Sequence, residues 1–309
     1  MKAAFLRNLL IKPNIIAHSE AGVIRRAILL AVFAGFAFTL SFACIKALGK
    51  EMPVQQVMLF RMSFGVFVLL PILIRAPNGI LKTSRPLDHL YRIVAGFTSM
   101  VLVYWAATRM TLSVLTATQF MMPLFVTVFS VPLLRESVGW RRTAATLVGF
   151  GGVVLMVHPA EAGIFNIDVA YGAAIAAALF YALAVIAMRQ LGKTEPAIRT
   201  TFYFSAVTAV ASGVACLVEW VNPMPYQWLL LIGTGIAGGL GQFAMVAAYK
   251  MAPASVVAPF DYVQLIWATV IGFIIWVEIP TLEAFSGAVV VIAAGLYIFR
   301  REALVRQKN

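Results

Sequence analysis

The chain has 309 residues, of which 62% are hydrophobic and only 12% are charged. An average soluble domain is about 45–50% apolar and about 25% charged, because charges cover its surface. This composition excludes an ordinary soluble domain and favours a membrane protein. A net charge of +12 in a soluble chain would favour nucleic-acid binding. Here the bases lie in short gaps between apolar runs, so no nucleic-acid partner is expected.

The first predicted segment, residues 1–26, is basic and is expected to be cytoplasmic. Its first 20 residues mix bases with apolar side chains, which is typical of a helix lying on the membrane surface or of an unstructured tail. Arg25 and Arg26 lead into a full-length apolar run without a small-residue cleavage site. A cleaved signal peptide is therefore not expected.

Ten apolar runs follow, each close to the 20 residues that cross a bilayer core as a helix. They lie near residues 27–47, 54–74, 91–108, 112–134, 142–158, 169–189, 199–218, 227–249, 254–277 and 283–300. Pro, Asn and Gly mark the gaps between them. The sequence thus predicts an all-α polytopic membrane protein with ten transmembrane helices and a cytoplasmic tail at 301–309. Its gaps are too short to hold a soluble domain.

The bases predict the orientation of these helices. With both termini in the cytoplasm, 20 of the 24 Lys and Arg lie in inner segments, and only Lys46, Lys50 and Arg109 lie in outer ones. Such an asymmetry is the positive-inside pattern. We expect a multi-pass protein of a bacterial-type inner membrane with both ends inside.

The two halves of the chain are related in sequence. A shift of 143 residues places Leu-Gly-Lys at 48–50 on the same tripeptide at 191–193, and a shift of 141 places Arg109 on Lys250. Each half, 27–158 and 169–300, holds five runs, so the second half must enter the membrane from the opposite side. Two inverted five-helix repeats are typical of secondary carriers, whose halves exchange conformations.

Several local sequences carry a resemblance to a known family. They are Arg61, the hexapeptide 104–109, Pro123, Glu136 before a Gly-rich fifth run, the pentapeptide 258–262 and Glu278. With them the chain resembles the EamA-type branch of the drug/metabolite transporter superfamily over residues 27–300. The resemblance implies a ten-helix carrier with a central substrate cavity. It also implies a substrate such as an amino acid, a nucleotide-like metabolite, S-adenosylmethionine or riboflavin.

Two charged residues lie deep inside predicted spans, where charges are costly and often functional. Arg61 follows Pro53 by eight residues, and Asp261 follows Pro253 by eight, from the opposite face. Each is therefore about 12 Å from its own face of a core about 30 Å thick. We predict that Arg61 and Asp261 face one central cavity and bind substrate, with a purely structural ion pair as the alternative.

Polar and aromatic side chains complete the predicted site. Asp261 and Gln264 share one face of the ninth span, and Thr116 and Gln119 share one face of the fourth. Helix–helix hydrogen bonding is the alternative for the glutamines. The aromatic candidates for stacking on a flat ligand, with helix packing as their alternative, are Tyr104, Trp105 and Tyr262.

One glycine pattern resembles a nucleotide-binding fingerprint but is not interpreted as one. Gly233, Gly235 and Gly238 have the spacing of the dinucleotide motif, which needs a strand, a turn and a helix outside the membrane. Here the glycines lie inside an apolar run. They predict close packing between helices instead.

Sets of residues for catalysis, metal binding or ATP hydrolysis are not found in the sequence. The two cysteines, Cys44 and Cys216, lie in apolar runs and predict neither a disulfide nor a metal site. We therefore expect no enzyme, no metal and no cofactor. The predicted function is a secondary transporter of a small organic metabolite working by alternating access, with a passive channel as the alternative. Its expected partners are the substrate and membrane lipid, while proton coupling, import or export, and a homodimer are left open.

Overall fold

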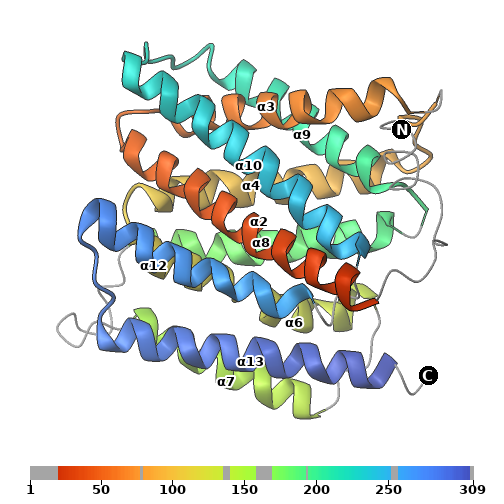
Figure 1. The fold of residues 1–309 in the computed structure, drawn as a ribbon, viewed down its shortest axis with the longest axis vertical. Coiled ribbons are helices and arrows are strands. Elements are labelled where there is room, and N and C mark those ends of the chain that lie inside the picture. The colour runs from red at the N-terminus through yellow and green to blue at the C-terminus, as the bar shows by residue number, and fades with distance from the viewer. Residues whose placement is uncertain are drawn as a thin grey trace.

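The computed structural model describes residues 20–76, 79–134, 140–157, 169–192, 194–251 and 257–306 as an assembly of helices. Ten helical segments cross the bundle in alternating directions, so that α2 begins and α13 ends at the same side of Figure 1. Their bounds are α2 Glu20–Leu48, α3 Val54–Ile74, α4 Pro86–Ala107, α5 Leu112–Gln119, α6 Met122–Leu134, α7 Trp140–Val157, α8 Val169–Leu191, α9 Ala197–Ala215, α10 Pro225–Met251, η1 Ala258–Tyr262, α12 Val263–Trp276 and α13 Leu282–Arg306.

The helices correspond one to one to the ten predicted apolar runs. Two of the crossings are interrupted, since α5 and α6 form the fourth and η1 and α12 form the ninth. The first helix begins within the predicted N-terminal segment, and α13 continues to Arg306 in the predicted tail. The surface helix or tail predicted within residues 1–19, and Glu136, lie outside the described residues.

Length and composition alone qualify six of the described segments as membrane spans. They begin with Gly22–Leu48 and include the combined fourth crossing, Leu112–Phe129. Two shorter apolar helices, Phe260–Trp276 and Leu282–Tyr297, add to them. An all-helical chain of this kind fits a polytopic membrane protein, because a helix satisfies its backbone hydrogen bonds internally.

The packing of the helices follows the sequence repeat. Under the shift by five crossings, the packing of α2 on α10 corresponds to that of α8 on α4, and α2 on α12 corresponds to α8 on α6. The same shift exchanges α3 with α9 and α7 with α13, so each of these two contacting pairs maps onto itself. In Figure 1, α7 and α13 form the lowest layer. The contacts thus carry the pseudo-twofold symmetry of two inverted five-helix repeats.

Glycines allow α10 to approach its neighbours, as the sequence predicted. A Cβ on Gly235 would lie 2.6 Å from the Cβ of Phe64 in α3, and a Cβ on Gly241 would lie 3.0 Å from the Phe38 ring in α2. In α7, Gly152 approaches Val290 of α13 in the same way, whereas a Cβ on Gly151 would meet no atom within 4 Å. Small residues at such positions bring helix backbones together in membranes.

We refer to the two ends of the bundle by the topology that the sequence predicts. The predicted outer end holds Lys46 and Glu278, and the predicted inner end holds His89 and Glu195. Prolines begin helices at both ends, since Pro53 and Pro196 precede the first residues of α3 and α9. At these positions the missing N–H of proline costs no hydrogen bond.

Candidate substrate site

The two interrupted crossings meet at the centre of the bundle. The fourth crossing breaks after Gln119, and the ninth begins with the short 3-10 helix that contains Asp261. An offset of 142 residues, close to the offsets of the sequence repeat, relates Phe120 to Tyr262, and these two rings lie 4.7 Å apart. The pseudo-twofold axis therefore passes close to this ring pair. Broken helices at the interface of inverted repeats are where secondary carriers place substrate.

Arg61 of α3 reaches this centre because α10 has a glycine opposite it. A Cβ on Gly238 would lie 2.6 Å from the guanidinium carbon of Arg61 and 2.7 Å from Nη1. The hydroxyl of Tyr104 in α4 forms a hydrogen bond with Arg61. The Nε of Arg61 is buried and has no hydrogen-bond partner among the described residues, so it remains available to an acceptor.

Tyr181 of α8 connects the charges around the centre. It interacts electrostatically with Asp261, Arg92 and Arg61, which come from three other crossings. Yet 43% of its surface is accessible. Since three charged side chains interact electrostatically with Tyr181, we interpret this surface as facing a space inside the bundle. Tyr262 also interacts with Asp261, so the carboxylate interacts electrostatically with two tyrosines.

The predicted polar candidates lie along the interrupted helices. Gln119 donates a 3.3 Å hydrogen bond to the carbonyl of Ala174 in α8. This is the helix–helix hydrogen bonding that was predicted as the alternative to a role in the site. Thr116 is buried, and its hydroxyl has no partner among the described residues. The backbone of Gln264 rests on α2, where its carbonyl accepts a 3.4 Å hydrogen bond from the hydroxyl of Thr39.

The predicted aromatic candidates divide into two groups. Tyr104 and Tyr262 lie beside Arg61 and Asp261. Trp105 is held in a different way, because the guanidinium of Arg109 lies 3.9 Å from its ring centroid and donates to its carbonyl at 2.9 Å. Arg109 thus covers one face of the Trp105 ring near the predicted outer end.

An ion pair joins the two repeats at the predicted outer end. Lys46 at the end of α2 pairs with Glu278, which follows α12. Lys46 also donates to the carbonyl of Met110 at 2.7 Å, and Glu278 accepts from the backbone N–H of Leu112 at 3.0 Å. This pair ties α2, α5 and α12 together.

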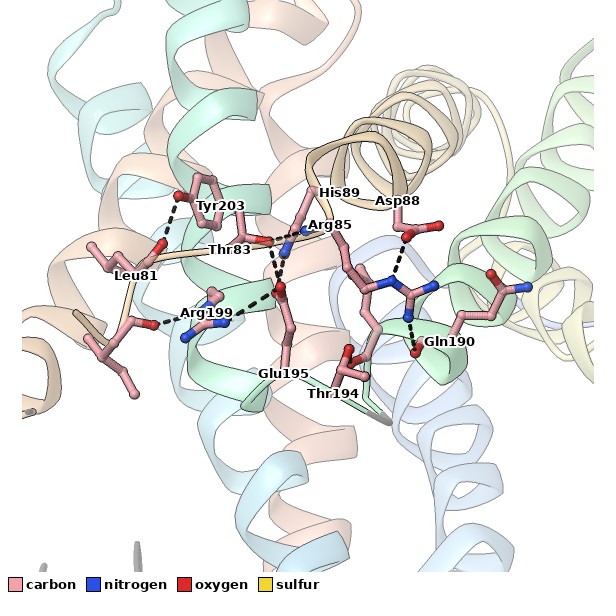
Figure 2. Close-up of polar contacts among 12 residues, drawn as sticks. Leu81, Thr83, Arg85, Asp88, His89, Gln190, Thr194, Glu195, Arg199 and Tyr203 are labelled. Carbon is pink, nitrogen blue, oxygen red and sulfur yellow. Dashed lines mark hydrogen bonds and ion pairs between the residues drawn. The ribbon is translucent and has the colours of Figure 1, made fainter.

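A buried network joins the repeats at the predicted inner end (Figure 2). Glu195, before α9, accepts a 2.5 Å hydrogen bond from the hydroxyl of Thr83 and lies 2.5 Å from Nε2 of His89 in α4. Nη1 of Arg199 is 3.5 Å from the same carboxylate. Burial raises the pKa of Glu195, but the hydrogen bonds from Thr83 and His89 and the charges of His89 and Arg199 outweigh it and hold the pKa below the usual 4.5. Glu195 is therefore an anion at neutral pH.

Loop contacts at the two ends are related by the repeat. At the predicted inner end Arg199 donates to the carbonyl of Ile80 at 2.6 Å. At the predicted outer end Gln56 donates to the carbonyl of Val221 at 2.9 Å. Offsets of 143 and 141 residues relate Gln56 to Arg199 and Ile80 to Val221. A carrier that alternates between two faces has to open such contacts in turn.

A cavity of about 250 Å³ lies apart from these charges. Its walls come from α5, α12 and α13 and are almost entirely apolar, with Val114, Leu265 and Phe285 among them. None of the residues that line it is a charged residue of the centre. We do not assign substrate to it, because a polar ligand there would lose hydrogen bonds to water without replacing them.

Sequence reasoning missed two residues of the centre. Arg92 had been counted among the inner-segment bases, but it lies inside α4, buried against α8 and α9. Tyr181 was not among the predicted site residues. Arg92 could have been found as a base that lies several residues past the proline that begins α4. No local feature of the sequence distinguishes Tyr181. Among the described residues no group of three or more His, Cys, Asp or Glu could hold a metal.

Two inverted repeats whose interrupted helices meet near half-buried charges define the class of a helical membrane transporter. Two segments, residues 25–158 and 169–300, each match the family model described as the EamA-like transporter family. The chain belongs to this family, and it is a multi-pass membrane transporter of small metabolites.

Similar proteins carry several transport functions. The chain is 32% identical to an S-adenosylmethionine uptake transporter of Rickettsia bellii, over 85% of this chain and 90% of that protein. It is 29% identical to a riboflavin transporter of Vibrio cholerae, over 87% and 91% of the two chains. It is also 25% identical to a pseudopaline exporter of Pseudomonas aeruginosa, over 90% and 97%. A solved crystal structure with 18% identity matches the fold with a TM-score of 0.63, over 89% of this chain and 98% of that chain.

Proposed function

We propose that this chain is a secondary carrier for metabolites that bear an amino-acid group, with S-adenosylmethionine as the leading candidate. The observation that carries the proposal is that Tyr181 interacts electrostatically with both Arg61 and Asp261, the latter in the short helix at the break of the ninth crossing. A zwitterion can place its carboxylate on Arg61 and its ammonium group on Asp261. Charge-assisted hydrogen bonds of this kind are about twice as strong as neutral ones.

The charges also separate this substrate class from the riboflavin class. Riboflavin has no charged group at neutral pH and offers no opposite charge to Arg61 or to Asp261 when it displaces water. Such desolvation of a charge is costly. An adenosine ring, by contrast, can stack on Tyr104, Tyr181 or Tyr262. The positive sulfonium of S-adenosylmethionine also suits Asp261 and aromatic faces.

Reconstituted protein tests the substrate and the mechanism together. We expect saturable uptake of radiolabelled S-adenosylmethionine that unlabelled S-adenosylmethionine inside the vesicles accelerates, because a carrier returns faster when loaded. S-adenosylhomocysteine should compete and riboflavin should not. Uptake that rises linearly with concentration and ignores internal substrate would indicate a pore. Competition by riboflavin without competition by S-adenosylmethionine would reject the proposed substrate class.

The proposed location is the inner membrane of a bacterium, with both termini in the cytoplasm. The support is the asymmetry of Lys and Arg between the two ends, and the transporter family gives no reason to expect an enzyme. A reporter fused after Asn309 or inserted near Lys82 should be active in the cytoplasm. One inserted near Glu161 should be active in the periplasm. A periplasmic C-terminus would contradict this topology.

A further inference from the structure

Arg92 is a second buried cation of the bundle, and the known contacts do not neutralise it. It lies six residues after the start of α4, and only 9% of its surface is accessible. Its guanidinium lies 4.2 Å from the ring centroid of Phe204 in α9, and Nη2 is 3.2 Å from the sulfur of Met188 in α8. A ring and a thioether are neutral, so both leave the positive charge in place.

The remaining donors of Arg92 have no partner in the part of the chain that the structure describes. Both Nε and Nη1 are buried without a hydrogen-bond acceptor, and none of the ion pairs among these residues involves Arg92. A charged side chain at such depth costs about 2.5–3.5 kcal/mol on insertion scales. Two unsatisfied donors that point in fixed directions from one guanidinium match the two oxygens of a carboxylate.

The pseudo-symmetry relates the surroundings of Arg92 to those of Arg61. An offset of 142 residues relates Gly96 to Gly238, and an offset of 143 relates Arg61 to Phe204. A Cβ on Gly96 would lie 2.6 Å from the Phe204 ring, just as a Cβ on Gly238 would lie 2.6 Å from the Arg61 guanidinium. In the second repeat a ring thus occupies the place of Arg61, and Arg92 stacks on this ring. Both arginines belong to the first repeat, with Arg61 at one of these two related positions and Arg92 against the ring at the other.

We infer that Arg92 and Tyr181 form a second binding site for the carboxylate of the substrate, on the predicted inner side of the broken helices. This Arg92 subsite rests on the proposed function and deepens it. Arg61 binds the carboxylate when the carrier is open to the outside, and Arg92 binds it when the carrier is open to the inside. Tyr181 interacts electrostatically with both arginines.

The depths of the two arginines suit such a transfer. Arg61 lies seven residues from the outer end of α3, and Arg92 lies six residues from the inner end of α4. At about 1.5 Å per residue in a core of about 30 Å, their levels differ by about 10 Å. This is close to the length of one small metabolite, so a substrate can exchange partners without crossing a long apolar stretch.

Transport measured separately from each face tests the Arg92 subsite. In oriented vesicles, Arg92→Gln should raise the half-saturating concentration of S-adenosylmethionine at the predicted inner face about tenfold or more, the value of one lost charged hydrogen bond. The outer value should change little. Arg61→Gln should have the opposite effect, and Arg92→Lys should recover part of the inner affinity. The matched control is Lys82→Gln, which removes an exposed charge at the same end and should leave both values unchanged.

A second measurement does not depend on the substrate. In a variant with Cys44→Ala and Cys216→Ala, a cysteine placed by Arg92→Cys should react with an anionic, membrane-impermeant thiol reagent from the inner face only. Equal effects of Arg92→Gln at both faces, or no effect at either, would overturn the subsite. So would a cysteine that is unreactive from both faces. Labelling of this cysteine in a protein that does not move S-adenosylmethionine would reject the proposed substrate while supporting the subsite.

Discussion

Replacing Arg61 with alanine is expected to reduce uptake by about 100-fold, because the substrate carboxylate loses a bidentate, charge-assisted partner worth about 3 kcal/mol. Arg61→Lys should keep the protein level but still lower uptake, since an ammonium group cannot bind two oxygens in a planar fork. Initial rates in proteoliposomes, corrected for reconstituted protein, give the measurement. Normal uptake by Arg61→Ala would remove Arg61 from the site.

Gly238→Ala tests the same guanidinium without removing it. The new Cβ would lie 2.6 Å from the guanidinium carbon of Arg61, and the flexible end of that side chain can move away. Uptake should therefore fall about tenfold while the melting temperature stays close to that of the wild type. Gly151→Ala is the matched control, because its Cβ would meet no atom within 4 Å.

Gly235→Ala should behave in the opposite way. Its Cβ would lie 2.6 Å from the Cβ of Phe64, an atom that cannot move without its backbone. We expect a loss of stability of about 1–3 kcal/mol from overpacking. If Gly238→Ala lowers stability as much as Gly235→Ala does, its effect on uptake would reflect damaged packing and not a displaced Arg61.

Replacing Asp261 with asparagine is expected to abolish concentrative uptake and to leave exchange intact. Asp261 lies between Phe260 and Tyr262 in the short helix that begins the ninth crossing, and it interacts electrostatically with Tyr181 and Tyr262. As the repeats rock and this electrostatic environment changes, Asp261 can take up a proton on one side and release it on the other. We propose that this cycle couples transport to the proton gradient.

An imposed pH gradient measures this coupling. Wild-type vesicles should accumulate substrate against its gradient, whereas Asp261→Asn vesicles should only equilibrate it. Ile266→Ala, in the same crossing with 61% of its surface accessible, is a control for local packing and should still concentrate substrate. Accumulation by Asp261→Asn equal to that of the wild type, or wild-type uptake that ignores the pH gradient, would rule out the proton role.

The ends of the bundle have to open during such a cycle. The pair of Lys46 with Glu278 joins the repeats at the predicted outer end, and the cluster of Glu195, His89 and Arg199 joins them at the predicted inner end. Both networks connect groups from different repeats, so relative motion of the repeats breaks them. Water can replace the partners of an ion pair at little net cost. Each network can therefore open when water enters its end of the bundle.

The sequence by itself determined the architecture of this protein. Apolar runs close to 20 residues long allow few structures other than helices that cross a bilayer, because lipid satisfies no backbone hydrogen bond. The repeat offsets of 141 and 143 residues predicted two inverted halves, and the helix pairs confirm them. Arg61 and Asp261 stood out in the sequence because charges inside such runs are rare, and Tyr181 interacts electrostatically with both.

Only the tertiary structure decided which faces of the helices look inward. Lipid and the protein interior are both apolar, so the side chains of a membrane helix do not alternate as those of a soluble helix do. Tyr181 and Trp105 therefore look alike in the sequence, yet one lies among buried charges and Arg109 covers the other. The burial of Arg92 depends on Met188 and Phe204, which are about 100 residues away in the chain. Such contacts arise from the packing of distant helices, which local composition does not encode.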